Sequence, residues 1–169
     1  MTPPFLVVMG VSGSGKSTLA ERLADFTGGQ FLEGDDFHPP ANKTKMGSGI
    51  PLDDSDRMPW FDVLIAAAKE CQARGVTPVL SCSALKQTYR DYLFRDFGDW
   101  RLIYLEGTFD LIKARMDARQ HEYMTSTLLE SQFATLEVPP PHPRLLTLTS
   151  EMTPEQWIAT FGHWFPGTY

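Results

Sequence analysis

The stretch that decides the fold reads Gly10-Val11-Ser12-Gly13-Ser14-Gly15-Lys16-Ser17-Thr18, and it fits the pattern G-x-x-x-x-G-K-[ST]. The apolar run Phe5–Met9 precedes it, and a helix-like pattern begins at Lys16. This order of strand, loop and helix is the setting in which a glycine-rich loop binds phosphate. The alternative is a chance match in a Gly- and Ser-rich turn, and the correct flanks argue against it. The sequence therefore predicts a nucleoside triphosphate site.

Each residue of this loop has an expected role. All nine, Gly10 to Thr18, are predicted to surround the nucleotide, because the glycines let backbone N–H groups turn inward around phosphate oxygens. Lys16 is expected to reach the β- and γ-phosphates and to act in catalysis, and the Ser17 hydroxyl is expected to ligate Mg²⁺.

Composition restricts the class of protein. A chain of 169 residues with 42% hydrophobic content suits one compact domain spanning residues 1–169. The net charge of −6 argues against nucleic acid as a partner. The chain shows no basic leader and no apolar stretch long enough for a bilayer, so we expect a cytoplasmic protein without a membrane partner. Cys71 and Cys82 lack metal-type spacing and are interpreted as core thiols.

Apolar runs alternate with helical patterns along the chain. The expected strands are Phe5–Met9, Gln30–Glu33, Thr77–Ser81, Arg101–Leu105 and Leu145–Leu148. The expected helices are Lys16–Phe26, Trp60–Arg74, Leu85–Phe94, Phe109–Arg119, Ser126–Leu136 and Pro154–Phe165, the last begun by a capping box of Thr153 and Gln156. The pattern predicts an α/β fold of three layers (α/β/α), with a parallel sheet of about five strands and helices on both faces. Gly34–Pro59 and Val138–Pro143 are predicted to lack regular structure.

Asp35 follows the second expected strand, at the sheet edge where ligands bind in such folds. Its carboxylate is therefore a candidate to accept the proton of an attacking hydroxyl, or to hold Mg²⁺ through water. The alternative is that Asp35 caps a turn. His38 is a candidate to bond a substrate hydroxyl, with a structural role as the alternative. No acidic residue ends the strand Thr77–Ser81, which argues against a mechanochemical ATPase.

Beyond the loop, longer blocks of sequence resemble the gluconate kinases. The matching residues are Glu33-Gly34-Asp35, His38-Pro39, Asn42, Lys45-Met46, Gly49-x-Pro51-Leu52-x-Asp54-x-Asp56-Arg57-x-Pro59-Trp60, Ser81-Cys82-Ser83-Ala84-Leu85-Lys86-x-x-Tyr89-Arg90-Asp91 and Leu128-Leu129-x-Ser131-Gln132-Phe133-x-Thr135-Leu136-Glu137. The resemblance implies the P-loop kinase fold, a substrate segment at residues 34–60 and a mobile lid at about 120–138. It also implies Mg²⁺-dependent transfer of the γ-phosphoryl group of ATP to the 6-hydroxyl of D-gluconate, by a homodimer.

Four cations are candidates to bind such a substrate. Gluconate has a carboxylate at one end, which Arg57, Lys86 and Arg90 are expected to hold, and the resemblance adds Lys45. Lys86 and Arg90 are four residues apart and share a helix face, where a solvated surface is the ordinary alternative. Trp60 is expected either to line the pocket or to belong to the core.

The helix Phe109–Arg119 carries two further candidates. Arg115 is expected to bind the nucleotide, and Arg119 to stabilise charge in the transition state as the lid closes; ordinary helix solubility is the alternative. The segment that follows departs from the family pattern Arg-x-Gly-His-Phe-Met, since His121 stands at the Gly position and Glu122 at the His position.

Two other functions stay open at this stage. One is a kinase of a related sugar acid or polyol, because the lid is altered. The other is a nucleotide-dependent binding module that has lost transfer chemistry. A binding module would show no acceptor-dependent turnover of ATP, and a comparison of D-gluconate with other acceptors separates the two kinases.

Overall fold

A computed structural model describes residues 1–119 and 126–167, with the side chain of Arg119 outside the description. Five parallel strands form its sheet: β1 (Phe5–Met9), β2 (Gln30–Glu33), β3 (Pro78–Ser81), β4 (Trp100–Glu106) and β5 (Leu145–Thr149). Their order is β2-β3-β1-β4-β5, with Val7 opposite both Leu80 and Leu102. Every residue of the central strand β1 is buried, so the strand that leads into the glycine-rich loop is also the core of the sheet.

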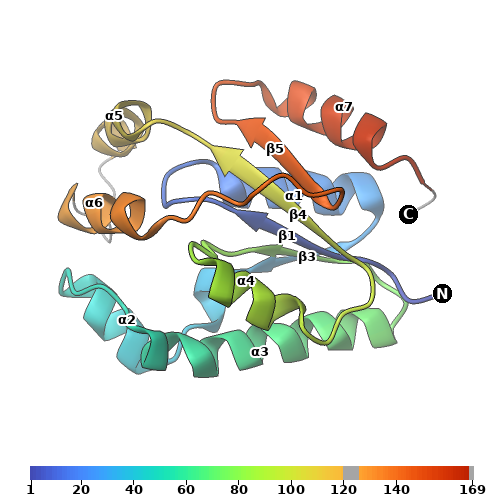
Figure 1. The fold of residues 1–169 in the computed structure, drawn as a ribbon, viewed down its shortest axis with the longest axis horizontal. Coiled ribbons are helices and arrows are strands. Elements are labelled where there is room, and N and C mark those ends of the chain that lie inside the picture. The colour runs from blue at the N-terminus through green and yellow to red at the C-terminus, as the bar shows by residue number, and fades with distance from the viewer. Residues whose placement is uncertain (120–125, 168–169) are drawn as a thin grey trace.

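Helices cover both faces of this sheet (Figure 1). On one face, α1 (Lys16–Thr27) and α7 (Pro154–Trp164) pack Leu23 and Phe161 against the sheet. On the other, α3 (Asp54–Ala73) and α4 (Gln87–Phe94) contribute Phe61 and Leu93 to a second core. The predicted three-layer α/β/α fold is confirmed, and so is the capping box of Thr153 and Gln156 at the start of α7.

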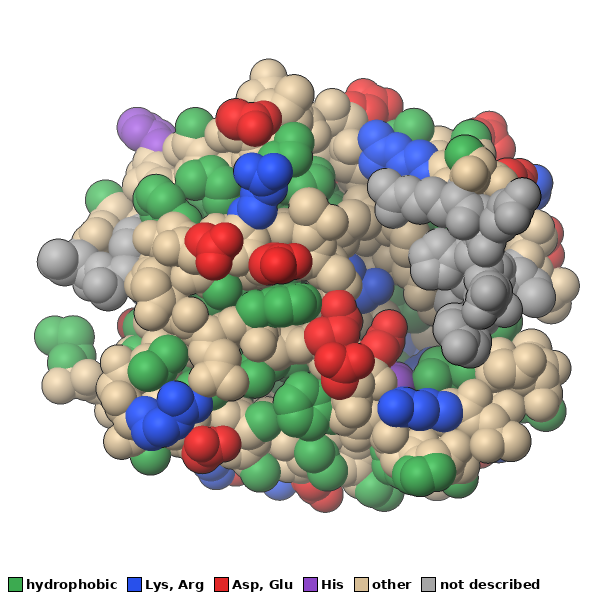
Figure 2. Space-filling view, turned by 180° about the vertical axis from the view of Figure 1, so that it is seen from behind, with side chains coloured by type: hydrophobic (Ala, Val, Ile, Leu, Met, Phe, Trp, Pro, Cys, Tyr) green, Lys and Arg blue, Asp and Glu red, His purple; other side chains and the backbone are tan. Residues whose placement is uncertain are grey.

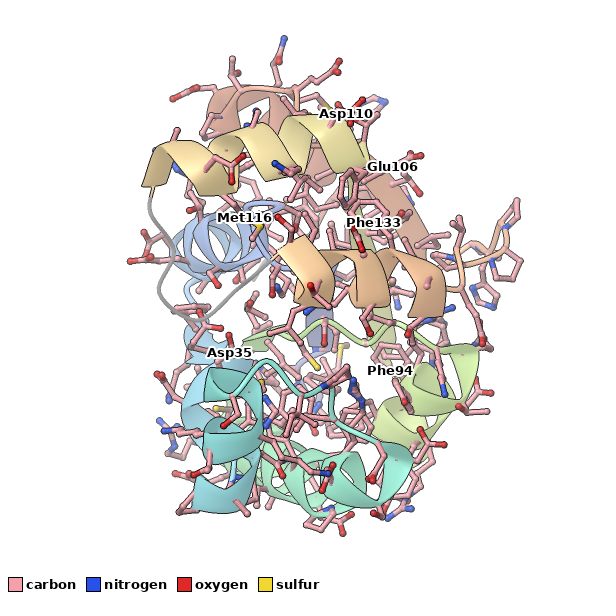
Figure 3. The ribbon with its side chains drawn as sticks, turned by 90° about the vertical axis from the view of Figure 1, so that its left-hand side faces the viewer. Asp35, Phe94, Glu106, Asp110, Met116 and Phe133 are labelled. Atoms are coloured by element: carbon pink, nitrogen blue, oxygen red, sulfur yellow. The ribbon has the colours of Figure 1, made fainter. Side chains whose placement is uncertain are left out.

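A third, smaller core lies at the carboxyl ends of the strands. There α5 (Phe109–Arg119) and α6 (Ser126–Thr135) place Ile112, Met116 and Leu129 against Val11 of the glycine-rich loop and against Leu85. Figure 1 shows this helix pair beside the end of β4, and Figure 3 shows Met116 and Phe133 on it, across from Asp35. The phosphate loop is thus packed against α5 and α6.

The prediction that 34–59 lacks regular structure is wrong. The segment forms the 3₁₀ turn η1 (Gly34–Phe37), α2 (Pro40–Gly47) and the first turns of α3, which begins six residues before the predicted Trp60. Pro40 occupies a favoured first-turn position, and Asp53 forms a capping box with Asp56. The many Pro and Asp residues thus begin helices. Residues 138–143 lack regular structure, as predicted.

Both cysteines are buried, as predicted, and burial raises the pKa of the Cys82 thiol to about 12. Among the described residues, no helix is long and apolar enough to cross a membrane. Residues 120–125, which include the substituted His121 and Glu122 and the first part of the expected lid, lie outside the description.

Gly34 is predicted to tolerate no side chain. A Cβ there would lie 2.3 Å from the Ser81 carbonyl oxygen, whereas a Cβ at Gly47 of α2 meets nothing within 4 Å. We expect Gly34→Ala to lower the free energy of unfolding by about 1–3 kcal/mol or more, the cost of overpacking. Gly47→Ala is the matched control and should not destabilise. Equal melting temperatures for the two variants would show that β2 and β3 are not packed this tightly.

Candidate active site

The glycine-rich loop connects β1 to α1 with its backbone donors unpaired at the helix end. Gly13 (φ 79°) and Gly15 (φ 99°) are left-handed, a conformation that disfavours other residues. No described side chain caps α1 at Gly15. The first N–H groups of the helix, at the positive end of its dipole, therefore point into the loop. Lys16 is 9% exposed at this position. Such a loop is built to surround an anion.

The Ser17 hydroxyl is 3.2 Å from the Ser81 hydroxyl at the end of β3. Among the described residues, no group of three or more His, Cys, Asp or Glu side chains could hold a metal ion. A hard cation such as Mg²⁺ prefers oxygen ligands and retains several waters, so a hydroxyl ligand together with phosphate oxygens fits it.

A cavity of about 970 Å³ opens beside the loop. Seven of the predicted site residues line it: Ser12, Gly13, Lys16, Asp35, His38, Arg57 and Lys86. Figure 2 shows acidic and basic side chains gathered around a hollow on this face. The fold therefore brings the phosphate loop, several exposed carboxylates that include Asp35, and the cations Arg57 and Lys86 to a single cavity.

Asp35 lies in η1, directly after β2, with its side chain 73% exposed to the cavity. Its pKa is lowered from the ordinary value, first by contact with the His38 side chain and next, among the charges, by Lys16, although burial acts in the opposite direction. Asp35 is therefore ionised at neutral pH and can accept a proton or a hydroxyl hydrogen bond.

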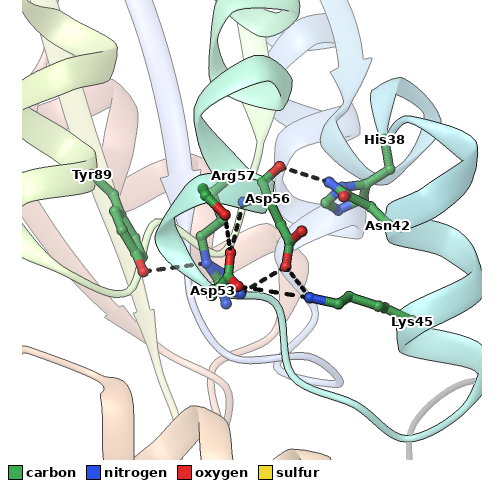
Figure 4. A network of polar contacts seen from close by, with 8 residues as sticks. His38, Asn42, Lys45, Asp53, Asp56, Arg57 and Tyr89 are labelled. Carbon is green, nitrogen blue, oxygen red and sulfur yellow. Dashed lines mark hydrogen bonds and ion pairs between the residues drawn. The ribbon is translucent and has the colours of Figure 1, made fainter.

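His38 lies beside Asn42 (Figure 4), and one of its ring nitrogens faces Asp35. The Asn42 amide nitrogen donates to the Asp56 carbonyl oxygen (3.0 Å), which fixes the orientation of the amide. The same nitrogen lies 3.3 Å from His38 Nδ1, so Nδ1 accepts and the ring proton is on Nε2. Nε2 is 3.6 Å from the Asp35 carboxylate. His38 also stacks on Trp60 at 3.9 Å and is buried, so it positions Asp35 as well as lining the cavity.

At the other side of the cavity, two cations flank Tyr89. The Arg57 guanidinium lies 5.1 Å and the Lys86 ammonium 5.4 Å from the ring centre. Arg57 Nε donates to the Tyr89 hydroxyl (3.3 Å), which in turn donates to the Asp54 carboxylate (2.5 Å). This hydrogen bond lowers the pKa of Asp54, and the neighbouring Tyr89 and Asp54 raise the pKa of Lys86. The cluster presents cations and hydrogen-bonding groups together.

Trp60 fits both of its expected roles. Its indole Nε1 donates to the Gly34 carbonyl oxygen (2.8 Å), and the ring is 2% exposed while still lining the cavity. Lys45 is placed differently from the expectation. Its ammonium is 2.7 Å from Asp56 and 3.7 Å from Asp53, so it joins α2 to the start of α3, and it is not among the residues lining the cavity.

Arg90 also lies elsewhere than expected. It is 2% exposed and does not line the cavity. Its guanidinium donates to the carbonyl oxygens of Ala84 (2.8 Å), Leu85 (3.1 Å) and Glu137 (2.9 Å). Ala84 has a left-handed φ of 45°, so Arg90 braces a strained turn after β3. The shared helix face with Lys86 does not form, because Lys86 is the residue that precedes α4. We therefore interpret Arg90 as a residue that positions the cavity wall.

The arginines of α5 are only partly placed. The Arg115 guanidinium donates to the Ser150 carbonyl oxygen (2.9 Å), and the Ser150 hydroxyl donates to the Ser14 carbonyl oxygen (2.8 Å). Arg115 is thereby connected to the phosphate loop through the turn after β5, but it does not line the cavity. Arg119 ends α5, and its side chain lies outside the described residues.

Several cavity residues were not singled out from the sequence. They are Lys43, Asp54, Ser83, Tyr89, Ser131, Gln132 and Thr135. Most of them stand inside the sequence blocks that carry the family resemblance, and that membership was the available signal. Nothing in their spacing separates them from neighbouring polar residues.

Fold and cavity together define a P-loop α/β protein, and a family model described as an AAA domain matches residues 5–139. The gluconokinase of Gluconobacter oxydans is 41% identical over 155 residues, covering 92% of this chain and 87% of that protein. The thermoresistant gluconokinase of Escherichia coli is 44% identical over 133 residues, covering 79% and 76%. The chain belongs to the gluconokinase family.

Solved structures agree with this assignment. A sugar kinase from Janibacter sp. has a TM-score of 0.89 at 42% identity, covering 96% of this chain and 94% of that one. A gluconokinase from Sinorhizobium meliloti has a TM-score of 0.80 at 41% identity, covering 94% and 89%. The fold alone extends further, since an APS kinase from Mycobacterium tuberculosis has a TM-score of 0.67 at 18% identity.

The two interpretations of Arg90 predict different results for Arg90→Met. Losing the brace leaves buried carbonyl oxygens unpaired at about 1–3 kcal/mol each, so the melting temperature should fall by about 5 °C or more. Arg95→Met, at an exposed position just after α4, should change it little. A variant with wild-type thermal stability and only a raised KM for an anionic acceptor would instead make Arg90 a substrate ligand.

Proposed function

We propose that this chain transfers the γ-phosphoryl group of ATP to the 6-hydroxyl of D-gluconate, giving ADP and 6-phospho-D-gluconate. The supporting observation is the single cavity in which Lys16 and Asp35 lie with Arg57 and Lys86. Membership of the gluconokinase family supports the same reaction.

The cavity matches an acceptor with two different ends. Arg57 and Lys86, beside Tyr89, suit a carboxylate, because guanidinium and ammonium groups form charge-assisted hydrogen bonds with it. Asp35 lies near the phosphate loop and suits the hydroxyl that is phosphorylated. Asp36 and Asp54 add acceptors for the hydroxyl groups between them. A polyhydroxy acid therefore fits better than a nucleoside or an apolar ligand.

The proposed transfer uses the residues in defined roles. The acceptor hydroxyl oxygen attacks the γ-phosphorus, the bond from that phosphorus to the bridging oxygen of ADP breaks, and the hydroxyl proton passes to the Asp35 carboxylate. Lys16 and the N–H groups at the start of α1 stabilise the negative charge on the phosphates. Mg²⁺, bound through Ser17 and phosphate oxygens, would neutralise further charge on the transferred group.

The family resemblance and the sequence support further proposals about the domain, its segments and its oligomeric state. We expect one kinase domain over residues 1–169, with an acceptor segment at 34–60 and a lid at about 120–138. Arg115 and Arg119 would serve the nucleotide side, and Lys45 would support the acceptor segment through α2. The protein would act as a cytoplasmic homodimer, with neither nucleic acid nor membrane as partner.

The proposal is tested by ADP release from Mg²⁺-ATP with a panel of acceptors. D-gluconate should stimulate release well above the rate without acceptor, and above its epimers, shikimate, glycerate and the neutral polyol sorbitol. ³¹P spectra of the product should show a phosphomonoester at C6. ATP binding without stimulation by gluconate would contradict the proposal, and preference for the neutral polyol would contradict the role of Arg57 and Lys86.

Asp35→Asn should lower kcat by about a hundredfold, the scale of lost general-base catalysis. Asp110→Asn is the control, since Asp110 is also exposed but does not line the cavity. Because the Asp35 pKa is below its ordinary value, kcat/KM of the wild type should not decline through Asp35 until the pH falls below the range in which an ordinary aspartate titrates. An effect of Asp35→Asn confined to KM would make Asp35 a binding residue.

A further inference from the structure

Gln132 of α6 contacts the phosphate loop directly. Its Oε1 accepts a hydrogen bond from the Ser12 backbone N–H (2.8 Å), and its Nε2 lies 3.2 Å from the Ser12 hydroxyl oxygen. A backbone N–H can only donate, so this bond fixes which end of the amide faces the loop. The amide nitrogen is then left to donate to the Ser12 hydroxyl. Both polar ends of Gln132 are therefore engaged by one residue of the loop.

The helix that carries Gln132 is anchored on both sides of this residue in the chain. Leu129 packs with Val11 and Met116 in the small core beside the loop. After α6, the Glu137 N–H donates to the Leu85 carbonyl oxygen (2.8 Å), and the Glu137 side chain accepts from the Gln87 N–H (3.0 Å). Gln132 thus connects the phosphate loop to a helix that is anchored on the acceptor side.

The contact between Gln132 and Ser12 lies where it can affect phosphoryl transfer. Ser131, Gln132 and Thr135 of α6 line the same cavity as the loop residues Ser12, Gly13 and Lys16, and Gln132 adjoins the loop at Ser12. A displacement of about 1 Å between reacting groups can reduce a rate a hundredfold. If α6 moved away from Ser12, the cavity would widen between its phosphate and acceptor sides. Water could then compete with the acceptor hydroxyl for the phosphoryl group.

We propose that Gln132 is a positioning residue that holds α6 against the phosphate loop through Ser12 and so couples ATP cleavage to phosphorylation of the acceptor. The inference rests on the proposed kinase function and adds a role that neither the loop motif nor the cations require. Gln132 does not carry the transferred proton, which goes to Asp35. Its effect is on the geometry in which transfer occurs.

The test compares Gln132→Met, which removes both hydrogen bonds at similar volume, with Gln132→Glu, whose carboxylate can accept from both the Ser12 N–H and the Ser12 hydroxyl. Glu130→Gln is the control, because Glu130 is exposed on the same helix and does not line the cavity. For each protein we would measure kcat, the dissociation constant for ATP, the melting temperature, and the ratio of ADP released to gluconate phosphorylated.

Gln132→Met should lower kcat about tenfold to a hundredfold and raise the ratio above one, with the dissociation constant for ATP within about twofold of wild type, because the N–H groups of Gly13 to Ser17 are untouched. Gln132→Glu should keep the ratio near one even if its charge slows turnover. Glu130→Gln should match wild type in all four measurements.

Two results would overturn the inference. One is a ratio of one in Gln132→Met, which would show that the contact does not control coupling. The other is an equally raised ratio in Gln132→Met and Gln132→Glu, which would show that the bond to Ser12 is not what matters. Failure of the proposed function is separate, because it appears in the wild type as the absence of gluconate-dependent ADP release.

Discussion

The structure depends on the unpaired backbone N–H groups where α1 begins. A helix cannot satisfy its first donors internally, and here left-handed glycines replace the side chain that would ordinarily cap them. β1 fixes this end in space because it is fully buried at the centre of the sheet. The loop is then held from three sides: by the Ser83 carbonyl oxygen to Gly10, by Ser150 to Ser14, and by Gln132 to Ser12. An anion-binding site is the result.

On the acceptor side of the cavity, charged side chains are paired with one another around the anion site. Most of the charged groups in and around the cavity are already engaged: Asp54 with Tyr89 and Lys86, Asp53 and Asp56 with Lys45, and Asp35 with His38. Ser55 and the Asp56 N–H hold the pKa of Asp53 at about 2, so this capping carboxylate stays ionised in its structural role. Asp35 differs in lying close enough to Lys16 of the phosphate loop for the lysine charge to lower its pKa. This division separates groups that build the cavity from those available to a substrate.

Most of the fold could be predicted from the sequence, because buried parallel strands are continuous apolar runs and the loop motif fixes where the first strand ends. The segment 34–59 could not, since Pro and Asp occur both in loops and at the first turn of helices, and only tertiary packing decides between them. In the cavity, the places of Lys16 and Asp35 could be predicted because each directly follows a strand or loop with a known geometry. Arg90 was misplaced, because a charged residue suggests solvent or ligand, whereas here carbonyl oxygens from two distant segments surround it. Gln132 carries no signal of its own, because an uncharged amide on a helix resembles any surface residue.

The central claim is that one cavity holds the acceptor by its carboxylate at Arg57 and Lys86 and by its reacting hydroxyl at Asp35. The most direct test is a crystal structure of the protein with Mg²⁺, a non-hydrolysable ATP analogue and D-gluconate. The account predicts the 6-hydroxyl within hydrogen-bond distance of Asp35 and facing the γ-phosphate, with the carboxylate on Arg57 or Lys86. Gluconate bound in the reverse direction, or outside this cavity, would contradict it.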